Sequence, residues 1–307
     1  MKIAVLGTGA MGSVYAGLLA DSGHEVWAID TWKEHIEAIR SNGLHIEGAS
    51  GDRVVRLQAT CDASEVGTAD LVIIATKAMH VESVAASARS LLCSDTTVLT
   101  IQNGLGSAKS VTRILGTTRI LIGVVGGFGA SIKAPGHVHH NGWEFVRLGE
   151  QEGLVTPRLE RIAEVWREAG FKVATYDDID RLVWEKLLCN VCFSGPCCVL
   201  EATLGEIIES PDAWRVASNC VSEAFDVACA LKIRLEIKDP ISYAREFGLK
   251  IPRARPSVLL DYLAGRKSEI DFINGAIPAA ARQYNLSAPY NEMIADLVRA
   301  KEEQLGL

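Results

Sequence analysis

Hydrophobic and polar positions follow two different patterns along this chain. Up to about residue 175, short apolar runs rich in β-branched residues alternate with stretches of helical periodicity. The runs are apolar almost throughout, which is typical of parallel strands covered by helices on both faces. The pattern predicts an α/β fold that begins with an N-terminal Rossmann-type doubly wound sheet. The strand candidates are "KIAVLG", "EVWAID", "DLVIIAT", "TTVLTIQN" and "RILIGVVG".

Two further segments alternate in the manner of antiparallel pairs. The sequence "GLHIEGASGDRVVRLQ" turns around residues 48–51, and "GHVHHNGWEFVRLGE" alternates across residues 136–150. A helix over "TPRLERIAEVWREAG", with Pro157 in its first turn, and a short strand "FKVAT" follow them. Antiparallel additions of this kind are common on parallel sheets.

The second half of the chain has helical periodicity almost everywhere and predicts six or seven helices. We therefore expect two domains, a dinucleotide-binding domain over 1–176 and an all-α substrate and catalytic domain over 177–307. A cleft between two domains is the default place for an active site. The expected helix breaks are Gly195-Pro196, Pro211, Pro240, Pro252, Pro256 and Pro289.

A glycine motif follows the first predicted strand. Gly7, Gly9 and Gly12 have the spacing G-x-G-x-x-G and open an apolar helix. Such glycines permit a tight turn, close approach of a pyrophosphate, and close packing of helix on strand, while the helix N-terminus offers free N–H groups. A turn without a ligand is the alternative. The residues expected to bind the cofactor here are Gly7, Thr8, Gly9, Ala10, Met11 and Gly12.

Asp30 ends the second predicted strand, 18 residues after Gly12. A carboxylate at this place accepts hydrogen bonds from the adenosine ribose and repels a 2′-phosphate, which favours NADH. Lys33 and Lys77 nevertheless offer positive charge nearby. The other interpretation is that Asp30 caps a helix beginning near Lys33.

Lys77 and Asn103 each follow the carboxyl end of a predicted strand. Ligands of open α/β sheets bind beside these ends, so both residues lie where a cofactor or substrate would bind, and Asn103 is a candidate for contacts with either. Each also has an ordinary interpretation, because Lys77 suits a solvated loop and Asn103-Gly104 suits a turn.

Lys186, Asn190 and Ser194 are spaced i, i+4 and i+8 on a helix expected from about Asp178 to Phe193, so they share one stripe. Burial favours the neutral form of a lysine, so a lysine on such a stripe gives up its proton more readily and suits catalysis. The alternative is that Lys186 extends to solvent with its stem packed on neighbours.

Composition narrows the classes of protein that these patterns allow. The 307 residues are 48% hydrophobic and 22% charged with a net charge of −7, which indicates a soluble globular protein without a basic tract for nucleic acid. We expect no signal peptide and no membrane span, and therefore a cytoplasmic protein.

Eight cysteines raise the question of a metal or redox site, above all in "WEKLLCNVCFSGPCC". Four of them lie close together at positions 189, 192, 197 and 198, but a helical i, i+3 pair lacks the turns of structural zinc sites. We expect small buried thiols that pack beside the cofactor site, and no metal site.

The motifs in order along the chain resemble those of the ketopantoate reductases (2-dehydropantoate 2-reductases). The resemblance covers essentially the whole chain. It is carried by "GTGAMG", "TKAMHVES", "QNGLGS", "WEKLLCNVCF", "RPSVLLDYLAGRKSEIDFING" and "APYNEMIADLVRAKE".

This resemblance implies NADPH-dependent reduction of a 2-oxo acid, ketopantoate, to (R)-pantoate in pantothenate and coenzyme A biosynthesis. It implies that Lys186 protonates the carbonyl oxygen as hydride reaches the carbon. Asn190 would orient the substrate and Ser257 would contact its carboxylate end. Glu269 would close the site near cofactor or substrate, or else pair with Arg266 or Lys267 on a solvated helix. Asn103 and Lys77 would line the cofactor side.

The chain also departs from the family's pattern. Ser194 and Leu204 stand where relatives often have asparagines, "SGPCCVLEATLGE" replaces the usual run there, and Asp30 stands where a basic residue is frequent. A related reductase for another 2-oxo or β-hydroxy acid is therefore one alternative. A nucleotide-binding sensor without turnover is another. The family resemblance also leaves a homodimer open.

Overall fold

The computed structural model describes residues 1–127, 129–142 and 145–307. The chain forms two units, and the boundary falls between Ile179 and Asp180. Three residues of the first half, Asn103–Leu105, group with the second unit. Unit 1 is therefore 1–102 with 106–179, and unit 2 is 103–105 with 180–307.

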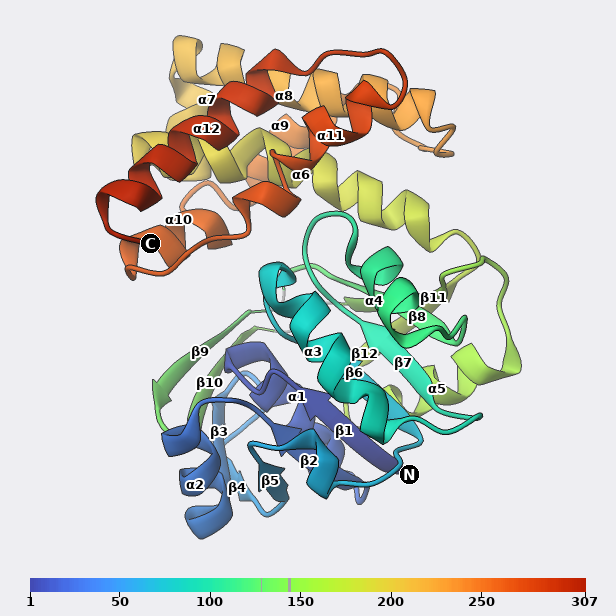
Figure 1. Ribbon diagram of the computed structural model, residues 1–307. Coiled ribbons are helices and arrows are strands. Elements are labelled where there is room, and N and C mark those ends of the chain that lie inside the picture. Colours follow the sequence, from blue (N-terminus) through green and yellow to red (C-terminus); the bar gives the residue numbers. More distant parts are fainter. Residues whose placement is uncertain (128, 143–144) are drawn as a thin grey trace. The chain divides into compact units, whose positions relative to one another are not determined.

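Unit 1 is built on a sheet of eight strands in the order β12-β11-β8-β7-β6-β1-β2-β5 (Figure 1). All neighbouring strands pair in parallel except β8 and β11. This confirms the predicted Rossmann-type sheet, whose strand order reverses direction between β1 and β6. The strands are β1 (Lys2–Leu6), β2 (Glu25–Ile29), β5 (Gln58–Thr60), β6 (Leu71–Ile74), β7 (Thr97–Thr100), β8 (Ile120–Val125), β11 (Phe145–Glu150) and β12 (Lys172–Tyr176).

Helices cover both faces of this sheet because the strands are apolar on both faces. Ile3 and Val5 of β1 pack in one core, while Ala4 and Leu6 pack in a separate core on the opposite face. The helices of unit 1 are α1 (Ala10–Asp21), α2 (Lys33–Asn42), α3 (Val81–Ser87), α4 (Ser107–Leu115) and α5 (Pro157–Glu168), with 3₁₀ turns η1 (Ala63–Glu65), η2 (Ala78–His80) and η3 (Ala88–Leu91).

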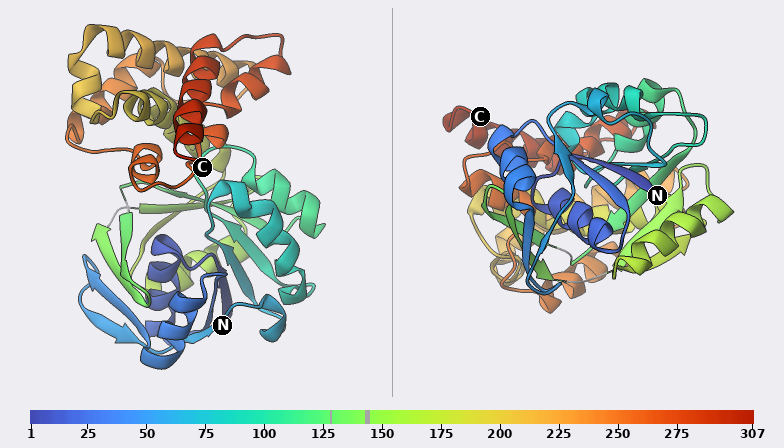
Figure 2. Two further views of the ribbon diagram at one scale, coloured as in Figure 1. Left: turned by 60° about the vertical axis from the view of Figure 1, so that its left-hand side comes forward. Right: turned by 90° about the horizontal axis from the view of Figure 1, so that it is seen from below.

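A smaller sheet of four strands, in the order β4-β3-β10-β9, lies against the other side of α1 (Figure 2). Its strands are β3 (Leu44–Gly48), β4 (Arg53–Val55), β9 (Gly129–Ala134) and β10 (His137–Gly142). Helix α1 is covered on two sides, and its residues from Gly12 to Leu19 are all buried. A Cβ atom at Gly17 would lie 2.2 Å from Cδ1 of Ile46 on β3.

The smaller sheet confirms one predicted strand pair and corrects the other. β3 and β4 pair antiparallel, as expected. The predicted pair across residues 136–150 is wrong, because β10 pairs with β9 and β3 whereas β11 joins β8 and β12 in the large sheet. Residues 143–144 of that segment lie outside the described residues. The turn of the observed hairpin contains Pro135 and Gly136, whose φ of +73° suits glycine.

Unit 2 consists of helices, as predicted. The α-helices are α6 (Ile179–Leu200), α7 (Leu204–Glu209), α8 (Pro211–Ala230), α9 (Pro240–Lys250), α10 (Ser257–Leu263), α11 (Ala276–Arg282) and α12 (Pro289–Gln304), with a 3₁₀ turn η4 (Ile270–Phe272). Prolines occupy the first position of α8, α9 and α12, where a missing N–H has no cost.

The predicted break at Gly195-Pro196 is wrong, because α6 continues through Pro196 to Leu200. Proline deprives the Cys192 carbonyl of its helical donor. The neighbouring Val191 carbonyl accepts a hydrogen bond from Nδ2 of Asn274 at 2.9 Å, so the polar backbone near the proline has a side-chain partner. Helix α6 is long and apolar enough to cross a membrane, but two-thirds of its most apolar 18 residues are buried in the protein.

Candidate active site

The glycine loop lies between β1 and α1, where each glycine meets a different constraint. Gly7 has a φ of +87°, and a Cβ atom there would lie 2.6 Å from the Thr76 backbone nitrogen. At Gly12 a Cβ atom would lie 2.1 Å from the Gly7 carbonyl oxygen, whereas at Gly9 it would meet no atom of the described residues within 4 Å. The first and third glycines are therefore needed for the turn, and the second leaves open space beside the backbone.

This loop presents unpaired polar groups where a pyrophosphate would bind. Gly9 is the N-cap of α1 and provides no capping side chain, so the first N–H groups of the helix, at Ala10 and Met11, lack helical acceptors. The Thr8 hydroxyl is buried and makes no hydrogen bond to any described residue. The residues present thus fit a dinucleotide.

Asp30 directly follows β2, the strand beside β1. Its Oδ1 accepts a hydrogen bond from the Trp32 backbone N–H at 3.0 Å. Helix α2 begins at Lys33, but its N-cap is Trp32, and no side chain in the described part of the chain caps it. The carboxylate of Asp30 therefore stabilises the turn before the helix and is not the helix cap.

Lys77 follows β6, the other neighbour of β1, and is the N-cap of η2. The glycine loop, Asp30 and Lys77 thus lie at the carboxyl ends of three adjacent strands. The loop before Lys77 is held by Gln102, whose Nε2 donates to the carbonyls of Ile74 and Thr76 at 2.6 and 3.2 Å. Lys77 itself is half-buried.

Trp32 also lies beside Asp30, and the sequence analysis did not identify it as a neighbour of the site. Its indole is 37% exposed and stacks on the His35 ring, with 4.9 Å between ring centroids. The available signal was an aromatic residue two positions after the strand-end aspartate.

A second group of polar side chains joins Lys186, Asn103 and Glu269 in unit 2. Nζ of Lys186 donates to Oδ1 of Asn103 at 2.7 Å, and Nδ2 of Asn103 donates to Oε2 of Glu269 at 3.3 Å. Lys186 and Asn103 are half-buried, and Glu269 is 3% exposed. One amide thus contacts a cation through its oxygen and a carboxylate through its nitrogen, using each group as its chemistry allows.

The backbone on either side of this amide is held closely. Gly104 has a φ of +81°, and a Cβ atom there would lie 2.0 Å from the Phe272 carbonyl oxygen. The Leu105 backbone N–H donates to the same oxygen at 3.0 Å. Asn103-Gly104 therefore forms a turn, and Asn103 also contacts Lys186.

Glu269 precedes η4, and its burial contradicts the alternative of a solvated position. Arg266, named in that alternative, forms an ion pair with Asp261, with 2.9 Å between Nη2 and Oδ1. Glu269 is buried rather than solvated, and its carboxylate contacts the Asn103 amide.

The other residues predicted to bind the substrate take no part in the hydrogen bonds among Lys186, Asn103 and Glu269 described above. Asn190 is half-buried and Ser194 is 2% exposed, both on α6 with Lys186, and Ser257 is the first residue of α10. Their contacts with a substrate stay predictions. Leu204, a departure from the family's pattern, lies in the apolar core of unit 2.

The cysteines of α6 are packed as small apolar residues. Cys189, Cys192, Cys197 and Cys198 are at most 4% exposed and are free thiols. Burial raises the pKa of Cys189 and Cys197 to about 12 and that of Cys198 to about 11, so at neutral pH these thiols are protonated. Thiolate chemistry is therefore disfavoured here.

The glycine loop at the end of β1, in a sheet with this strand order, defines a dinucleotide-binding protein of the Rossmann class. Two family models cover most of the chain. One, described as ketopantoate reductase PanE/ApbA, matches residues 3–153, and its C-terminal counterpart matches residues 178–302. The chain belongs to the ketopantoate reductase family, a family of oxidoreductases.

Individual relatives agree with this assignment. The 2-dehydropantoate 2-reductase of Halobacterium salinarum is 30% identical, over 97% of this chain and 98% of that protein. A PanE/ApbA family ketopantoate reductase from Ralstonia eutropha has 30% identity and a TM-score of 0.92 over the full length of both chains. A D-mandelate dehydrogenase solved with NADH and anilino(oxo)acetate has 31% identity and a TM-score of 0.90, also over both full lengths.

Proposed function

We propose that the protein reduces a 2-oxo acid to a 2-hydroxy acid with a nicotinamide cofactor, and that its substrate is ketopantoate. The observation that carries this proposal is the Lys186 ammonium group, which Asn103 holds at 2.7 Å beside the buried Glu269. Membership of the ketopantoate reductase family supports the choice of substrate.

Lys186 acts on the carbonyl oxygen of the substrate. When bound, the nicotinamide supplies a hydride to the carbonyl carbon, so negative charge develops on the oxygen. A positioned ammonium neutralises this charge and then gives up its proton to the oxygen. The Asn103 carbonyl limits the positions of Nζ, and Glu269 in turn orients the Asn103 amide. Asn190, Ser194 and Ser257 are the candidates for contacts with the rest of the acid.

The cofactor is held by the glycine loop and by Asp30. N–H groups at the start of α1 bind the pyrophosphate, and Lys77 lines the same edge of the sheet. We propose that NADH is preferred, because Asp30 accepts hydrogen bonds from the ribose hydroxyls and repels a 2′-phosphate. The likeness to a D-mandelate dehydrogenase solved with NADH supports this preference.

Steady-state turnover of Lys186→Met tests the proposal, with ketopantoate and a panel of 2-oxo acids, each with NADH and NADPH. The variant keeps the apolar stem and loses the proton donor, so kcat should fall by about 10²–10⁴-fold. NADH affinity, measured by fluorescence, should stay unchanged. Lys172→Met, at an exposed position of β12, is the control and should keep wild-type turnover.

Two outcomes would decide against this function. Turnover of Lys186→Met close to that of the wild type, with normal NADH binding, would remove Lys186 from the mechanism. Binding of NADH by the wild type without oxidation by any acid would instead indicate a nucleotide sensor.

A different 2-oxo acid is the second candidate substrate. The D-mandelate dehydrogenase acts as its name states and is as similar to this chain as the ketopantoate reductases are. The same panel separates the two, because an aryl 2-oxo acid would then give a higher kcat/KM than ketopantoate.

A further inference from the structure

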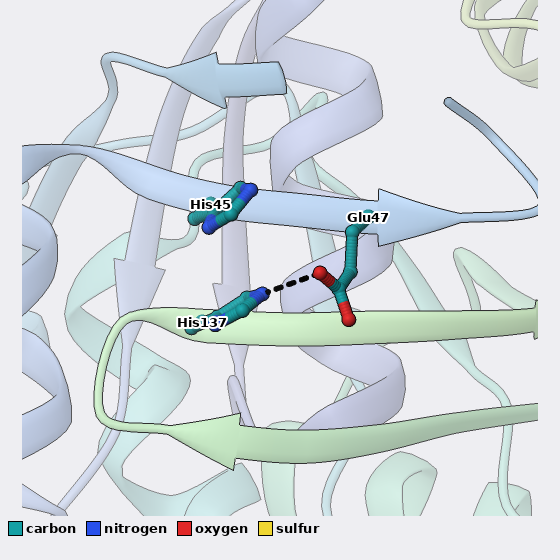
Figure 3. A group of neighbouring side chains, drawn as sticks. All are labelled: His45, Glu47 and His137. Carbon is teal, nitrogen blue, oxygen red and sulfur yellow. Dashed lines mark ion pairs between the residues drawn. The ribbon is translucent and has the colours of Figure 1, made fainter. Parts of the chain in front are cut away.

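Four side chains with metal-binding chemistry share one face of the smaller sheet in unit 1. Strands β3 and β10 pair in parallel, with His45 opposite His137 and Glu47 opposite His139. Since alternate residues of a strand face the same side, all four project from one face. Figure 3 shows three of them, with His45 and Glu47 on one strand and His137 on its neighbour.

The ligand atoms in this group are close together. One ligand atom from each of His45, Glu47 and His137 lies within 4.8 Å of the other two. Nε2 of His137 is 3.2 Å from Oε2 of Glu47, and Nδ1 of His139 is 3.1 Å from Oε1 of the same carboxylate. Glu47 therefore lies between two imidazoles.

The burial and partners of these groups point toward an ion. The side chains of His45, Glu47 and His137 are 27–33% exposed, so they are accessible yet partly desolvated. Nε2 of His137 is itself buried and makes no well-aligned hydrogen bond to any described residue. Oδ1 of Asp52 contacts Nε2 of His45 at 2.7 Å, as outer carboxylates do when they orient a ligating imidazole.

We propose that His45, Glu47 and His137 bind a divalent transition-metal ion of the zinc class, with His139 available as a fourth ligand. Imidazole nitrogens and a carboxylate oxygen are typical ligands of Zn²⁺. A tetrahedral ion with bonds near 2.0–2.1 Å separates its ligand atoms by about 3.3–3.4 Å, which the His137 and Glu47 pair already approaches.

Binding requires one local rearrangement. The His45 and His137 rings are stacked, with 4.0 Å between centroids and 13° between planes, so their lone pairs lie in two nearly parallel planes and do not meet at one ion. Rotation of the His45 ring about its Cβ–Cγ bond turns its lone pair toward the ion. This bond is among the softer side-chain torsions, so the rotation needs no backbone movement.

The site is independent of the proposed catalytic function. It lies in the smaller sheet, whereas Lys186, Asn103 and Glu269 lie in unit 2. An ion here would connect β3 and β10, whose paired residues Glu47 and His139 are 92 positions apart in the chain. Its effect should therefore be on the stability of unit 1, since an ion that binds only the folded state raises the unfolding midpoint.

Zn²⁺ binding to the full chain tests the proposal, with Cys61, Cys93 and Cys229 changed to serine because these exposed thiols also bind zinc. Equilibrium dialysis with metal analysis should give one ion per chain, and Zn²⁺ should raise the thermal midpoint. His137→Ala should weaken binding by about 100-fold. His80→Ala, at an exposed histidine outside the group, should bind as the parent does.

A second variant keeps the test decisive if His137→Ala fails to fold. Glu47→Gln preserves the shape of the side chain, and with an unchanged circular dichroism spectrum it should also lose the bound ion. Co²⁺ gives an independent readout, since ligation by nitrogen and oxygen lacks the thiolate charge-transfer band. Absence of stoichiometric binding, wild-type affinity in both variants, or a thiolate band in the Co²⁺ complex would each overturn the proposal.

Discussion

Asn103 places an amide between a lysine and a glutamate. Its oxygen accepts from Lys186 and its nitrogen donates to Glu269, so each charged group meets the amide end of opposite polarity. A carboxylate at this position would face Glu269 with a like charge. The Asn103 amide therefore holds the Lys186 ammonium group through a neutral acceptor.

The sequence predicted these residues but not their contacts. Helical phase placed Lys186 on a stripe with Asn190 and Ser194, and Asn103 was recognised because it follows a strand. The hydrogen bond between Lys186 and Asn103 joins residues 83 positions apart, and no local pattern encodes it. Asn103 was predicted to contact cofactor or substrate, and its hydrogen bonds group it with Lys186 and Glu269 in unit 2.

Asp30 should decide the choice between NADH and NADPH. In Asp30→Ser the repulsion of a 2′-phosphate is lost, so the ratio of kcat/KM for NADPH to that for NADH should rise by about tenfold or more, ~1.4 kcal/mol. Initial rates with both cofactors measure it. Glu34→Ser, an exposed acidic residue on α2, should leave the ratio unchanged, and an equal shift in both variants would contradict a specific role for Asp30.

The β1–α1 turn is the element that the sequence predicted best, since three glycines at fixed spacing after a strand encode it locally. Their constraints differ, however. Gly12 is crowded by the Gly7 carbonyl, while the side of Gly9 where a Cβ would lie is open. Gly12 is therefore required for folding, whereas Gly9 is expected to matter for binding.

Alanine at Gly9 should therefore affect mainly NADH binding, and alanine at Gly12 mainly folding stability. Gly9→Ala has a negative φ of −67° and open space for its methyl group, so it should lower stability less than Gly12→Ala does, but the methyl group should weaken NADH binding by about tenfold or more, ~1.4 kcal/mol. Gly12→Ala should lower the free energy of unfolding by about 1–3 kcal/mol. Urea unfolding and NADH titration measure the two effects. NADH binding as tight in Gly9→Ala as in the wild type would show that its open space is not a ligand site.

Two elements differ from the prediction because distant residues decide them. Helix α6 continues past Pro196 in a core where a Cβ atom at Gly195 would lie 2.1 Å from Ile294 of α12. Strand β10 pairs with β3 from far earlier in the chain, so the alternation at 136–150 could not identify its partner. Periodicity detects that a segment is a strand or helix, and tertiary packing selects its neighbours.

A buried histidine of α2, His35, connects α1 with the turn between β9 and β10. Nε2 of His35 lies 3.1 Å from the Ser13 hydroxyl, which donates to the Thr8 carbonyl, while Nδ1 accepts from the Gly136 backbone N–H. Both ring nitrogens are thus used by the neutral form. Burial holds the pKa of His35 below its usual value, and the same is true of His140.

This network should make the protein sensitive to acid. The unfolded chain binds more protons at His35 below about pH 6.5, so the free energy of unfolding falls as the pH decreases from there toward the lower folded-state pKa. In His35→Gln the loss of stability between pH 7 and pH 5 should be smaller, although the variant should start about 1–3 kcal/mol lower at pH 7. Urea midpoints at both pH values measure this, with His80→Gln as control. If His35→Gln loses as much stability between pH 7 and pH 5 as the wild type, His35 is not a source of the acid sensitivity.

The cysteines fall into an exposed set and a buried set, and the buried set can report the unfolding of unit 2. Cys61 and Cys93, in unit 1, are exposed and should react with a thiol reagent at once, as should Cys229. Cys192, Cys197 and Cys220, in unit 2, are fully buried and can react only when the helices around them separate. Mass spectrometry of the slow labelling phase would therefore report how often unit 2 opens, without any introduced probe.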